Sequence, residues 1–325
     1  MSLDADAIVD RRRMRRKLTF WRVFAILIAI VAVVAVGARF ARGTLFANAP
    51  GNYIARVTIT GIIRNNQERV EALDRLAKSR ARAVIVRVDS PGGTTAGAEQ
   101  LYDSLRAVAA KKPLVVVVDG LAASGGYITA MASDHIIAQQ SSLVGSIGVL
   151  FQFPNVATLL DKIGVKVEEI KSSPLKAAPN GFEPTSPEAR AAIEAIVLDS
   201  YAWFKGLVKD RRHLDDAQLT RVADGRVFTG RQGVPLKLVD EIGNEKTALA
   251  WLEKEKKVPA TTPVRDFSLE PRFSELSFLH VAAFAFQAVG LSAVAQRIEE
   301  WGGVQAFERL NLDGLLALWH PPASN

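Results

Sequence analysis

Short, strongly apolar runs that alternate with amphipathic segments constrain the fold of this chain more than any other feature. Residues 83–88 read AVIVRV and residues 114–118 read LVVVV, which is typical of strands buried on both faces of a sheet. Between them, residues 96–110 carry apolar side chains at helical spacing. Strands that alternate with helices pair in parallel, so the body of the chain is predicted to be an α/β fold.

The same criteria predict the other elements of the body. Further strands are expected at 54–59, near 136, near 149 and at 165–170, and further helices at 67–79, 124–133, 156–163, 187–211 and 215–222. The α/β domain is assigned to residues 50–256, with a loop at 172–187. Residues 257–325 are predicted to be a helical extension that contacts other subunits or the membrane surface, and a second membrane span within 274–319 is the alternative.

The N-terminal segment predicts a membrane anchor. A basic cluster at 11–17 precedes an uncharged run at 23–38, which would rise about 24 Å as a helix. Residues 20–42 are therefore assigned to a transmembrane helix, and the positive-inside rule places residues 1–19 in the cytoplasm. A cleaved signal peptide, ending near Ala47-Asn48-Ala49, and a buried soluble helix are the alternatives.

Composition excludes several classes of site. The chain has no cysteine, so disulfides, thiolate metal sites and a cysteine nucleophile are excluded. Its four histidines lie at no metal-ligand spacing, and we expect neither a metal nor an organic cofactor. Most of the formal net charge of +7 comes from residues 1–42, so the nearly neutral body is not expected to bind nucleic acid.

Three glycine-bearing turns follow predicted strands, at 89–93 (DSPGG), 119–127 (DGLAASGGY) and 145–149 (GSIGV). Ligands of α/β sheets bind at the carboxyl ends of strands. Paired glycines there allow the backbone to approach a ligand and direct adjacent N–H groups at a developing oxyanion. These turns are therefore the predicted position of a catalytic site.

Ser124 is the candidate nucleophile, because it precedes two glycines and begins a predicted helix. The local pattern equally allows a helix N-cap. Ser90 is expected to have only a turn role beside Pro91. A nucleophilic serine needs a base, but His135 is expected to be structural and His213 lies in a charged run.

Lysine is the other possible base, provided that burial leaves the amine neutral. Lys176 lies in SSPLKAAP, away from the charged runs that surround most lysines of the chain. Taken alone, this setting also fits an exposed loop lysine.

The chain resembles the bacterial signal-peptide peptidase A family, in its short, single-repeat, membrane-anchored form. Six motifs carry the resemblance in family order: RVDSPGG (87–93), DGLAASGGY (119–127), VGSIGV (144–149), IKSSPLK (170–176), ADGRVFTGRQ (223–232) and LVDEIG (238–243). The resemblance implies a Clp-protease/crotonase-like fold. Asp89, where the family has asparagine, departs from the pattern.

The resemblance also implies roles for individual residues. Ser124 would be the nucleophile, Lys176 and not Lys171 the general base, and Ser146 the hydroxyl that orients the lysine. The backbone N–H groups of Gly93 and Gly125 would form the oxyanion hole. Residues 224–226 (Asp224, Gly225 and Arg226) would be structural.

The expected function is that of a membrane-anchored serine endopeptidase with a Ser/Lys dyad. It would degrade cleaved signal peptides or other hydrophobic peptides at the inner membrane, with its catalytic domain on the periplasmic or extracytoplasmic side. The resemblance implies a homo-oligomer whose sites lie at subunit junctions. A crotonase-type acyl-CoA enzyme and a catalytically inactive membrane scaffold are the alternatives.

Overall fold

The computed structural model describes residues 17, 20–21, 52–269 and 315–319. Residues 1–51 and 52–325 are separate compact units. The predicted cytoplasmic tail and anchor therefore lie almost entirely outside the described residues, as does most of the predicted C-terminal extension. Within the described ranges, no helix has the length and apolar character needed to cross a membrane.

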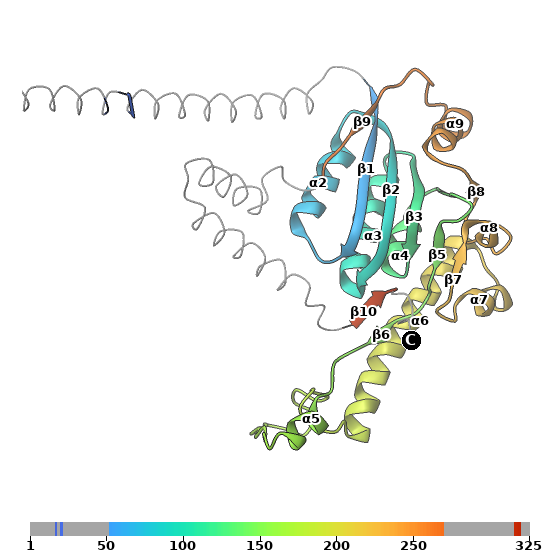
Figure 1. Ribbon diagram of the computed structural model, residues 1–325. Coiled ribbons are helices and arrows are strands. Elements are labelled where there is room, and N and C mark those ends of the chain that lie inside the picture. The colour runs from blue at the N-terminus through green and yellow to red at the C-terminus, as the bar shows by residue number, and fades with distance from the viewer. Residues whose placement is uncertain (1–16, 18–19, 22–51, 270–314, 320–325) are drawn as a thin grey trace, which may run out of the picture. The chain divides into compact units, whose positions relative to one another are not determined.

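Helices and strands alternate over residues 53–138 and again over residues 227–266 (Figure 1). The strands are β1 (Tyr53–Ile63), β2 (Ala81–Thr94), β3 (Leu114–Ala123), β4 (His135–Ala138), β5 (Leu143–Gly145), β6 (Leu150–Phe151), β7 (Val227–Thr229), β8 (Glu241–Ile242), β9 (Val264–Asp266) and β10 (Leu315–Leu318). The helices are α2 (Gln67–Lys78), α3 (Thr95–Ala109), α4 (Gly125–Ala130), α5 (Ala157–Lys162), α6 (Pro187–Arg212), α7 (Asp216–Val222), α8 (Gly230–Gly233) and α9 (Glu245–Lys256).

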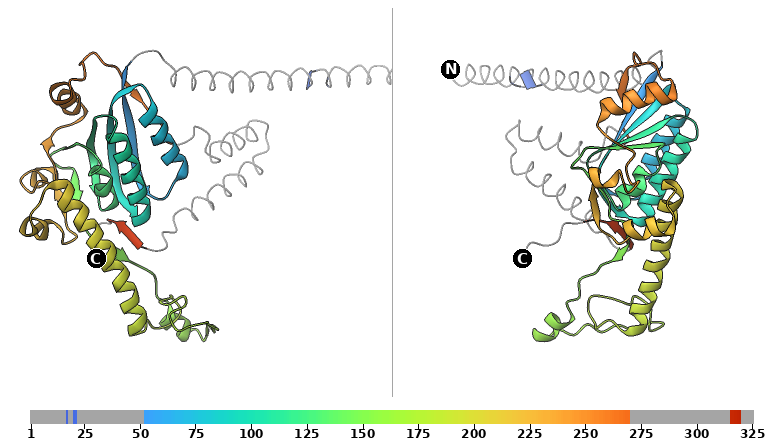
Figure 2. Two further views of the ribbon diagram at one scale, coloured as in Figure 1. Left: turned by 180° about the vertical axis from the view of Figure 1, so that it is seen from behind. Right: turned by 90° about the vertical axis from the view of Figure 1, so that its right-hand side faces the viewer.

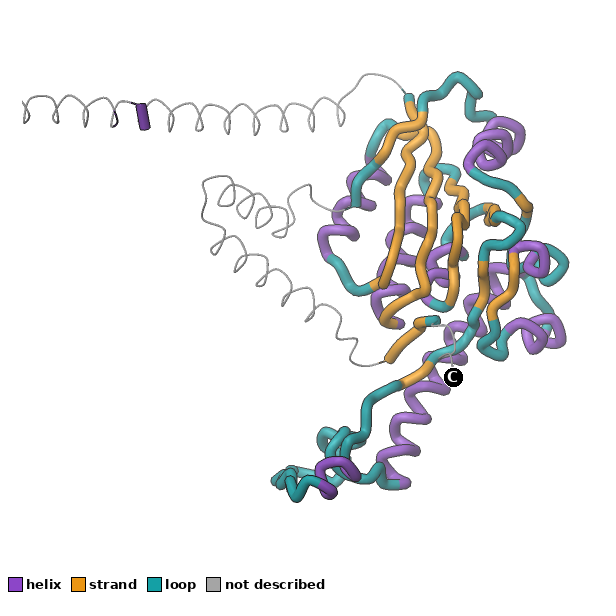
Figure 3. The backbone as a smooth tube through the Cα atoms, viewed as in Figure 1, coloured by secondary structure: helices purple, strands orange, loops and turns teal. Residues whose placement is uncertain are grey.

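The N-terminal halves of the long strands form a parallel sheet in the order β9-β1-β2-β3-β4-β8. This sheet is the orange layer of Figure 3. Its parallel pairing confirms the predicted α/β class. The first strands and helices follow the predicted order and lie close to their predicted bounds.

The C-terminal ends of β2 and β3 exchange their neighbours. Residues 121–123 of β3 pair with β5, which pairs antiparallel with β7. Residues 92–94 of β2 pair antiparallel with β10, which also pairs antiparallel with β6. The three predicted glycine turns therefore meet where the sheet changes partners.

Alternate residues of the buried strands supply two apolar layers, as a period of two requires. Val84, Val86 and Val88 face the larger cluster, which includes buried residues of α2, α3, α4 and α6. Ile85 and Val117 face the smaller cluster, which includes α9. Figure 2 shows α2 and α3 on one side of the sheet and α9 on the other.

Side-chain caps fix where several helices begin. The Asn66 side chain accepts from the Arg69 N–H at 3.0 Å, and the Thr94 hydroxyl accepts from the Gly97 N–H at 3.1 Å. Ser186 caps α6, which has proline at its first position. Such caps satisfy donors that the helix leaves unpaired.

The structure differs from the sequence-based expectation in several places. Residues 165–170 form no strand, and both Val165 and Val167 are exposed. Residues 143–145, 227–229, 241–242 and 264–266 form strands that were not predicted, and residues 230–233 and 245–256 form helices that were not predicted. Residues 315–318, assigned to a helical extension, instead form β10, because ladder partners are available on both sides of this segment.

Candidate active site

Ser124 lies at the sharp turn between β3 and α4. Its backbone has φ 54° and ψ −117°, a left-handed region that costs a non-glycine residue about 1–3 kcal/mol. The Ser124 N–H donates to the Gly145 carbonyl at 2.8 Å, and its own carbonyl accepts from Tyr127 and Ile128. These hydrogen bonds hold the turn in its strained conformation.

The Ser124 side chain makes no capping hydrogen bond, although the residue holds the N-cap position of α4. The residue is 1% exposed. Of the two local interpretations that the sequence allowed, a side-chain cap is therefore not observed. The hydroxyl is available for other chemistry.

The two turns that contain the predicted oxyanion glycines, Gly93 and Gly125, lie against each other. A Cβ atom added to Gly92, which has φ +102°, would lie 2.7 Å from the Gly125 nitrogen. A Cβ on Gly126 would lie 2.5 Å from the Ser90 carbonyl oxygen. The DSPGG and ASGG turns are thus packed backbone against backbone, and side chains at these positions would force them apart.

Ser90 holds the first of these turns. Its buried hydroxyl donates to the Gly61 carbonyl at 2.6 Å and accepts from the Gly92 N–H at 3.1 Å. The predicted turn role of Ser90 is therefore observed. Its hydroxyl also binds the backbone of Gly92, the residue before Gly93. The sequence alone did not indicate this link to the proposed oxyanion hole.

Ser146 lies on the neighbouring strand end. β3 and β5 are parallel with Ala123 opposite Gly145, so Ser124 and Ser146 follow paired residues. Ser146 is largely buried, has φ 52°, and donates its backbone N–H to the Arg226 carbonyl at 2.8 Å. The structure thus brings Ser124, Ser146 and the glycine turns together.

The ADGRVF segment supports the Ser146 turn. The Arg226 guanidinium forms an ion pair with Asp224, which raises the arginine pKa and lowers the aspartate pKa. Phe228 would lie 3.1 Å from a Cβ on Gly145. The structural role that the resemblance implied for residues 224–226 fits these contacts.

Lys176 is not brought to Ser124 within one chain. Its side chain is exposed in the segment 152–186, here called the arm, which lies between β6 and α6. Figure 1 shows α5 and its flanking loops away from α4, at the N-terminal end of α6. Among the described residues, no hydrogen bond or ion pair joins Lys176 to Ser124 or Ser146.

Lys171 is held by carboxylates. Its ammonium lies 2.6 Å from Glu169 and 2.6 Å from Glu183. Hydrogen bonds to these two groups raise the lysine pKa above its usual range. A charged Lys171 cannot accept a proton from serine. The ion pairs of Lys171 therefore distinguish it from Lys176, the other lysine of the IKSSPLK motif.

The histidines in the described ranges take structural positions. The His135 ring stacks on Trp251 with centroids 4.8 Å apart and lies 3.3 Å from a Glu241 oxygen. His213 ends α6 in a left-handed conformation. Neither residue contacts the Ser124 turn, which agrees with the roles predicted for them.

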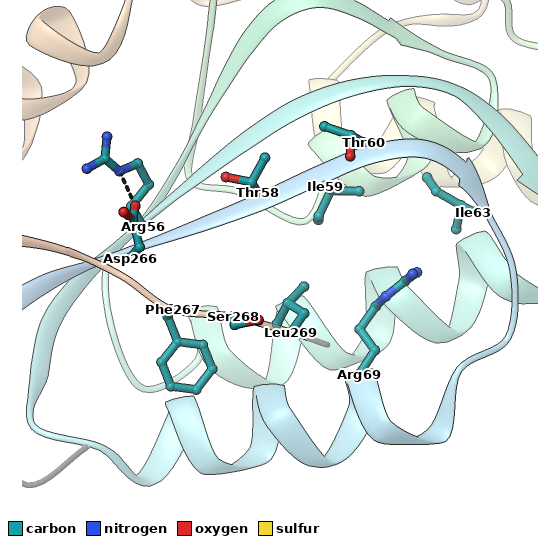
Figure 4. A pocket seen from close by; sticks show the side chains of 10 residues that line it. All are labelled: Arg56, Thr58, Ile59, Thr60, Ile63, Arg69, Asp266, Phe267, Ser268 and Leu269. Atoms are coloured by element: carbon teal, nitrogen blue, oxygen red, sulfur yellow. Dashed lines mark ion pairs between the residues drawn. The ribbon is translucent and has the colours of Figure 1, made fainter. Parts of the chain in front are cut away.

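Two cavities lie away from the Ser124 turn. One, of about 310 Å³, lies between β1, α2 and residues 266–269, with Arg56 and Arg69 at its sides (Figure 4). The other, of about 440 Å³, lies within the arm and includes Lys171 and Glu183. The described residues contain no cluster of side chains suited to a metal ion.

Family models match much of the α/β unit. The model described as "Peptidase family S49" matches residues 106–259, and the model described as "Clp protease" matches residues 57–142. Together they cover the strands and turns that build the Ser124 site. The second match supports the predicted Clp-like form of the α/β fold.

Several curated proteins are similar to this chain. A Synechocystis protein named as a protease is 36% identical over 200 residues, covering 61% of this chain and 72% of that protein. An Enterococcus faecium protein named as signal peptide peptidase SppA is 31% identical, covering 68% of this chain and 69% of that protein. Protease 4 of Haemophilus influenzae is 33% identical, but only 31% of it is covered.

A solved structure of a ClpP1 mutant from Listeria monocytogenes also aligns with the chain. It covers 58% of this chain and 91% of that one, at 15% identity and a TM-score of 0.38. This likeness is too weak to add to the family models.

Proposed function

Because the chain belongs to peptidase family S49, we propose that it is an endopeptidase in which Ser124 is the nucleophile and Lys176 the general base. The observation that carries this proposal is the Ser124 turn. A serine without a side-chain cap lies in a strained conformation between two glycine turns, at the carboxyl ends of parallel strands. Strain maintained by surrounding hydrogen bonds is typical of functional positions.

Each group has a defined step in the proposed reaction. Ser124 Oγ attacks the substrate carbonyl while the neutral Lys176 amine takes its proton. The N–H groups of Gly93 and Gly125 stabilise the oxyanion, which amounts to about 3–4 kcal/mol per donor in other serine peptidases. The lysine returns the proton to the leaving amine, and water then hydrolyses the acyl-serine.

The lysine would come from a neighbouring copy of the chain. In one chain Lys176 is exposed on the arm, whose apolar side chains Leu159, Ile163 and Phe182 are exposed as well. Contact between the arm and another copy would bury these apolar groups and remove water from the ammonium, which favours the neutral amine. Ser146, beside Ser124, is then positioned to orient the incoming lysine.

We place the catalytic unit outside the cytoplasm, anchored by residues 20–42, with remnant signal peptides or similar hydrophobic peptides as substrates. This assignment depends on the basic cluster and uncharged run of the N-terminal sequence. A reporter fused after Asn325 should behave as exported. A reporter protected on the cytoplasmic side would reverse the topology.

Hydrolysis of a fluorogenic hydrophobic peptide by the full chain in detergent tests the proposed activity. Ser124→Ala should lower kcat/KM by several orders of magnitude, because the acyl intermediate cannot form. Ser133→Ala is the matched control, since Ser133 is also buried but its hydroxyl bonds to the Ala130 carbonyl at 2.8 Å. Near-normal turnover by Ser124→Ala would overturn the proposal and leave a crotonase-type use of the glycine turns as the alternative.

A further inference from the structure

Three helices, α2, α3 and α9, end at the edge of the sheet where the parallel strands begin. α2 ends at Lys78, shortly before β2, and α3 ends at Ala109, shortly before β3. The Lys256 ammonium at the end of α9 lies 3.8 Å from an oxygen of Asp134, the residue before β4. In Figure 1 the loop after α9 runs along the end of the sheet where β1 begins. The segments that follow these three helices therefore share one end of the α/β unit.

These segments carry a concentration of positive charge. Residues 78–82, 111–112 and 254–257, here called the basic rim, contain eight basic side chains and one acidic side chain. All of the basic residues except Lys112 are exposed. The chain beyond residue 42 is nearly neutral as a whole, so its charge is distributed unevenly, with an excess of positive charge at this end.

Contacts within the rim bring basic groups close to one another. The Lys112 ammonium donates to the Ser79 carbonyl at 2.7 Å and to the Ala81 carbonyl at 2.9 Å, which joins the segment after α3 to the start of β2. Burial and the charge of the neighbouring Lys111 lower the pKa of Lys112. The positive charge of the rim is therefore not neutralised within the rim itself.

Helix ends account for only part of this charge. Basic side chains in the last turn of a helix stabilise it, because they lie at the negative end of the helix dipole. Arg80 and Arg82, however, lie beyond the end of α2. Among the described residues, no ion pair includes either of these two arginines. Their charge is available to a partner outside the α/β unit.

The predicted membrane anchor would join the unit at this rim. Tyr53, the first residue of β1, lies opposite Ala81, which is within the rim. Nine residues, 43–51, separate the predicted anchor from Asn52. A linker of this length spans no more than roughly 30 Å when it is fully extended. The rim is therefore within reach of the membrane surface.

We propose that the basic rim binds anionic phospholipid headgroups of the membrane that residues 20–42 would enter. This inference rests on the anchor assigned under the proposed function. It adds a second contact with the membrane, which fixes the orientation of the α/β unit on the bilayer. Anionic lipid surfaces attract basic segments beside a membrane anchor, and the attraction falls off within a Debye length, about 10 Å at 0.1 M salt.

This contact holds the proposed active site away from the lipid. Ser124 follows the last residue of β3, whereas residues 111–112 of the rim precede its first residue. A strand of that length spans about 30 Å. Peptide substrates therefore reach Ser124 after they have left the headgroup region.

Fluorescence quenching of the full chain in nanodiscs tests the contact. Because the chain has no cysteine, a dye on Ala110→Cys reports one position beside the rim. A dye on Ala96→Cys reports the other end of α3, about 20 Å away, and both alanines are exposed. The nanodiscs carry a headgroup-linked quencher in phosphatidylcholine alone or mixed with phosphatidylglycerol.

Quenching at residue 110 should increase several-fold when phosphatidylglycerol is present, and it should exceed quenching at residue 96. In about 1 M salt, where the Debye length is about 3 Å, the increase should disappear. Equal quenching in both lipids, or at both positions, would overturn the proposed contact.

Charge-reversal variants test whether the rim itself makes the contact. Lys78→Glu combined with Arg80→Glu should remove the lipid-dependent quenching at residue 110. Arg221→Glu combined with Arg231→Glu is the matched control, because it makes the same change of charge at exposed residues outside the rim, and it should retain the quenching. Unchanged lipid dependence in the rim variant would overturn the assignment to these residues.

Washing the nanodiscs in salt separates the contact from the anchor. A chain that stays in the washed nanodiscs but shows no lipid-dependent quenching overturns the rim contact, favours an acidic protein as the partner, and leaves the proposed anchor. A chain that is lost from the washed nanodiscs overturns both. Peptide hydrolysis on the same nanodiscs tests Ser124 independently, and the rim variant should keep it.

Discussion

Among single residues, some side chains are proposed to carry out the chemistry, and others only hold the backbone of the site. The glycines beside Ser124 at a predicted strand end made it a candidate nucleophile or a helix cap, whereas only the family resemblance implied a role for Ser146. Nothing in the sequence indicated that Ser90 secures the Gly92 N–H or that the Arg226 carbonyl holds Ser146. Hydrogen bonds of this kind form only when the chain has folded, so no short sequence pattern predicts them.

Substitution of the two lysines separates their roles. Lys176→Arg should reduce peptide hydrolysis by orders of magnitude, because a guanidinium stays charged and cannot accept the serine proton. Lys171→Arg should keep most of the activity, since arginine preserves the ion pairs with Glu169 and Glu183.

The comparison of the two variants decides the assignment of the base. An active Lys176→Arg enzyme would rule out the lysine base. Loss of activity in Lys171→Arg alone would move that role to Lys171.

Among the secondary-structure elements, most long ones were predicted from the sequence, α9 being an exception, whereas most of the short strands were not. The apolar runs predicted β2 and β3, and apolar residues at helical spacing predicted α2, α3 and α6. Strands such as β6 and β10 span few residues, and their existence depends on partners brought by the fold. The alternating pattern at 165–170 suggested a strand, but no described strand pairs with it.

The packing of the glycine turns predicts the effect of one added methyl group. Gly126→Ala should destabilise the fold by about 1–3 kcal/mol, because its Cβ would lie 2.5 Å from the Ser90 carbonyl and buried backbone must shift. The shift would displace the Ser124 turn, so activity should also fall. Thermal and urea unfolding midpoints measure the change.

Gly206→Ala is the matched control for Gly126→Ala. Gly206 lies within α6 and nothing lies within 4 Å of an added Cβ. Alanine there should stabilise the helix by about 0.5–1 kcal/mol. Equal and small effects of both substitutions would show that the turns are not tightly packed.

At the scale of the whole molecule, a single chain holds the proposed nucleophile and oxyanion donors but displays the proposed base on an exposed arm. The family resemblance predicted that sites form at subunit junctions, and the exposed Lys176 supports that hypothesis. The predicted anchor lies outside the described residues. A β10 strand at the site was not predictable, because only the folded register brings residues 315–318 to Gly93.

Mixed assemblies test whether two chains build one site. Ser124→Ala and Lys176→Ala should each be inactive alone, and they should recover part of the wild-type activity when assembled together, because some junctions pair an intact serine with an intact lysine. Differently tagged chains purified in two steps verify mixing. Verified mixed assemblies without activity, or a fully active monomer, would show that each chain supplies both groups.

Labelling by a serine-reactive phosphonate, with the attachment site mapped by peptide mass, tests whether Ser124 is a nucleophile activated by Lys176. We expect one adduct, on Ser124, which is retained in Lys171→Arg and absent in Ser124→Ala. Labelling should be strongly reduced in Lys176→Arg, because no base removes the serine proton. Attachment to a different serine, or undiminished labelling of Ser124→Ala, would contradict this assignment.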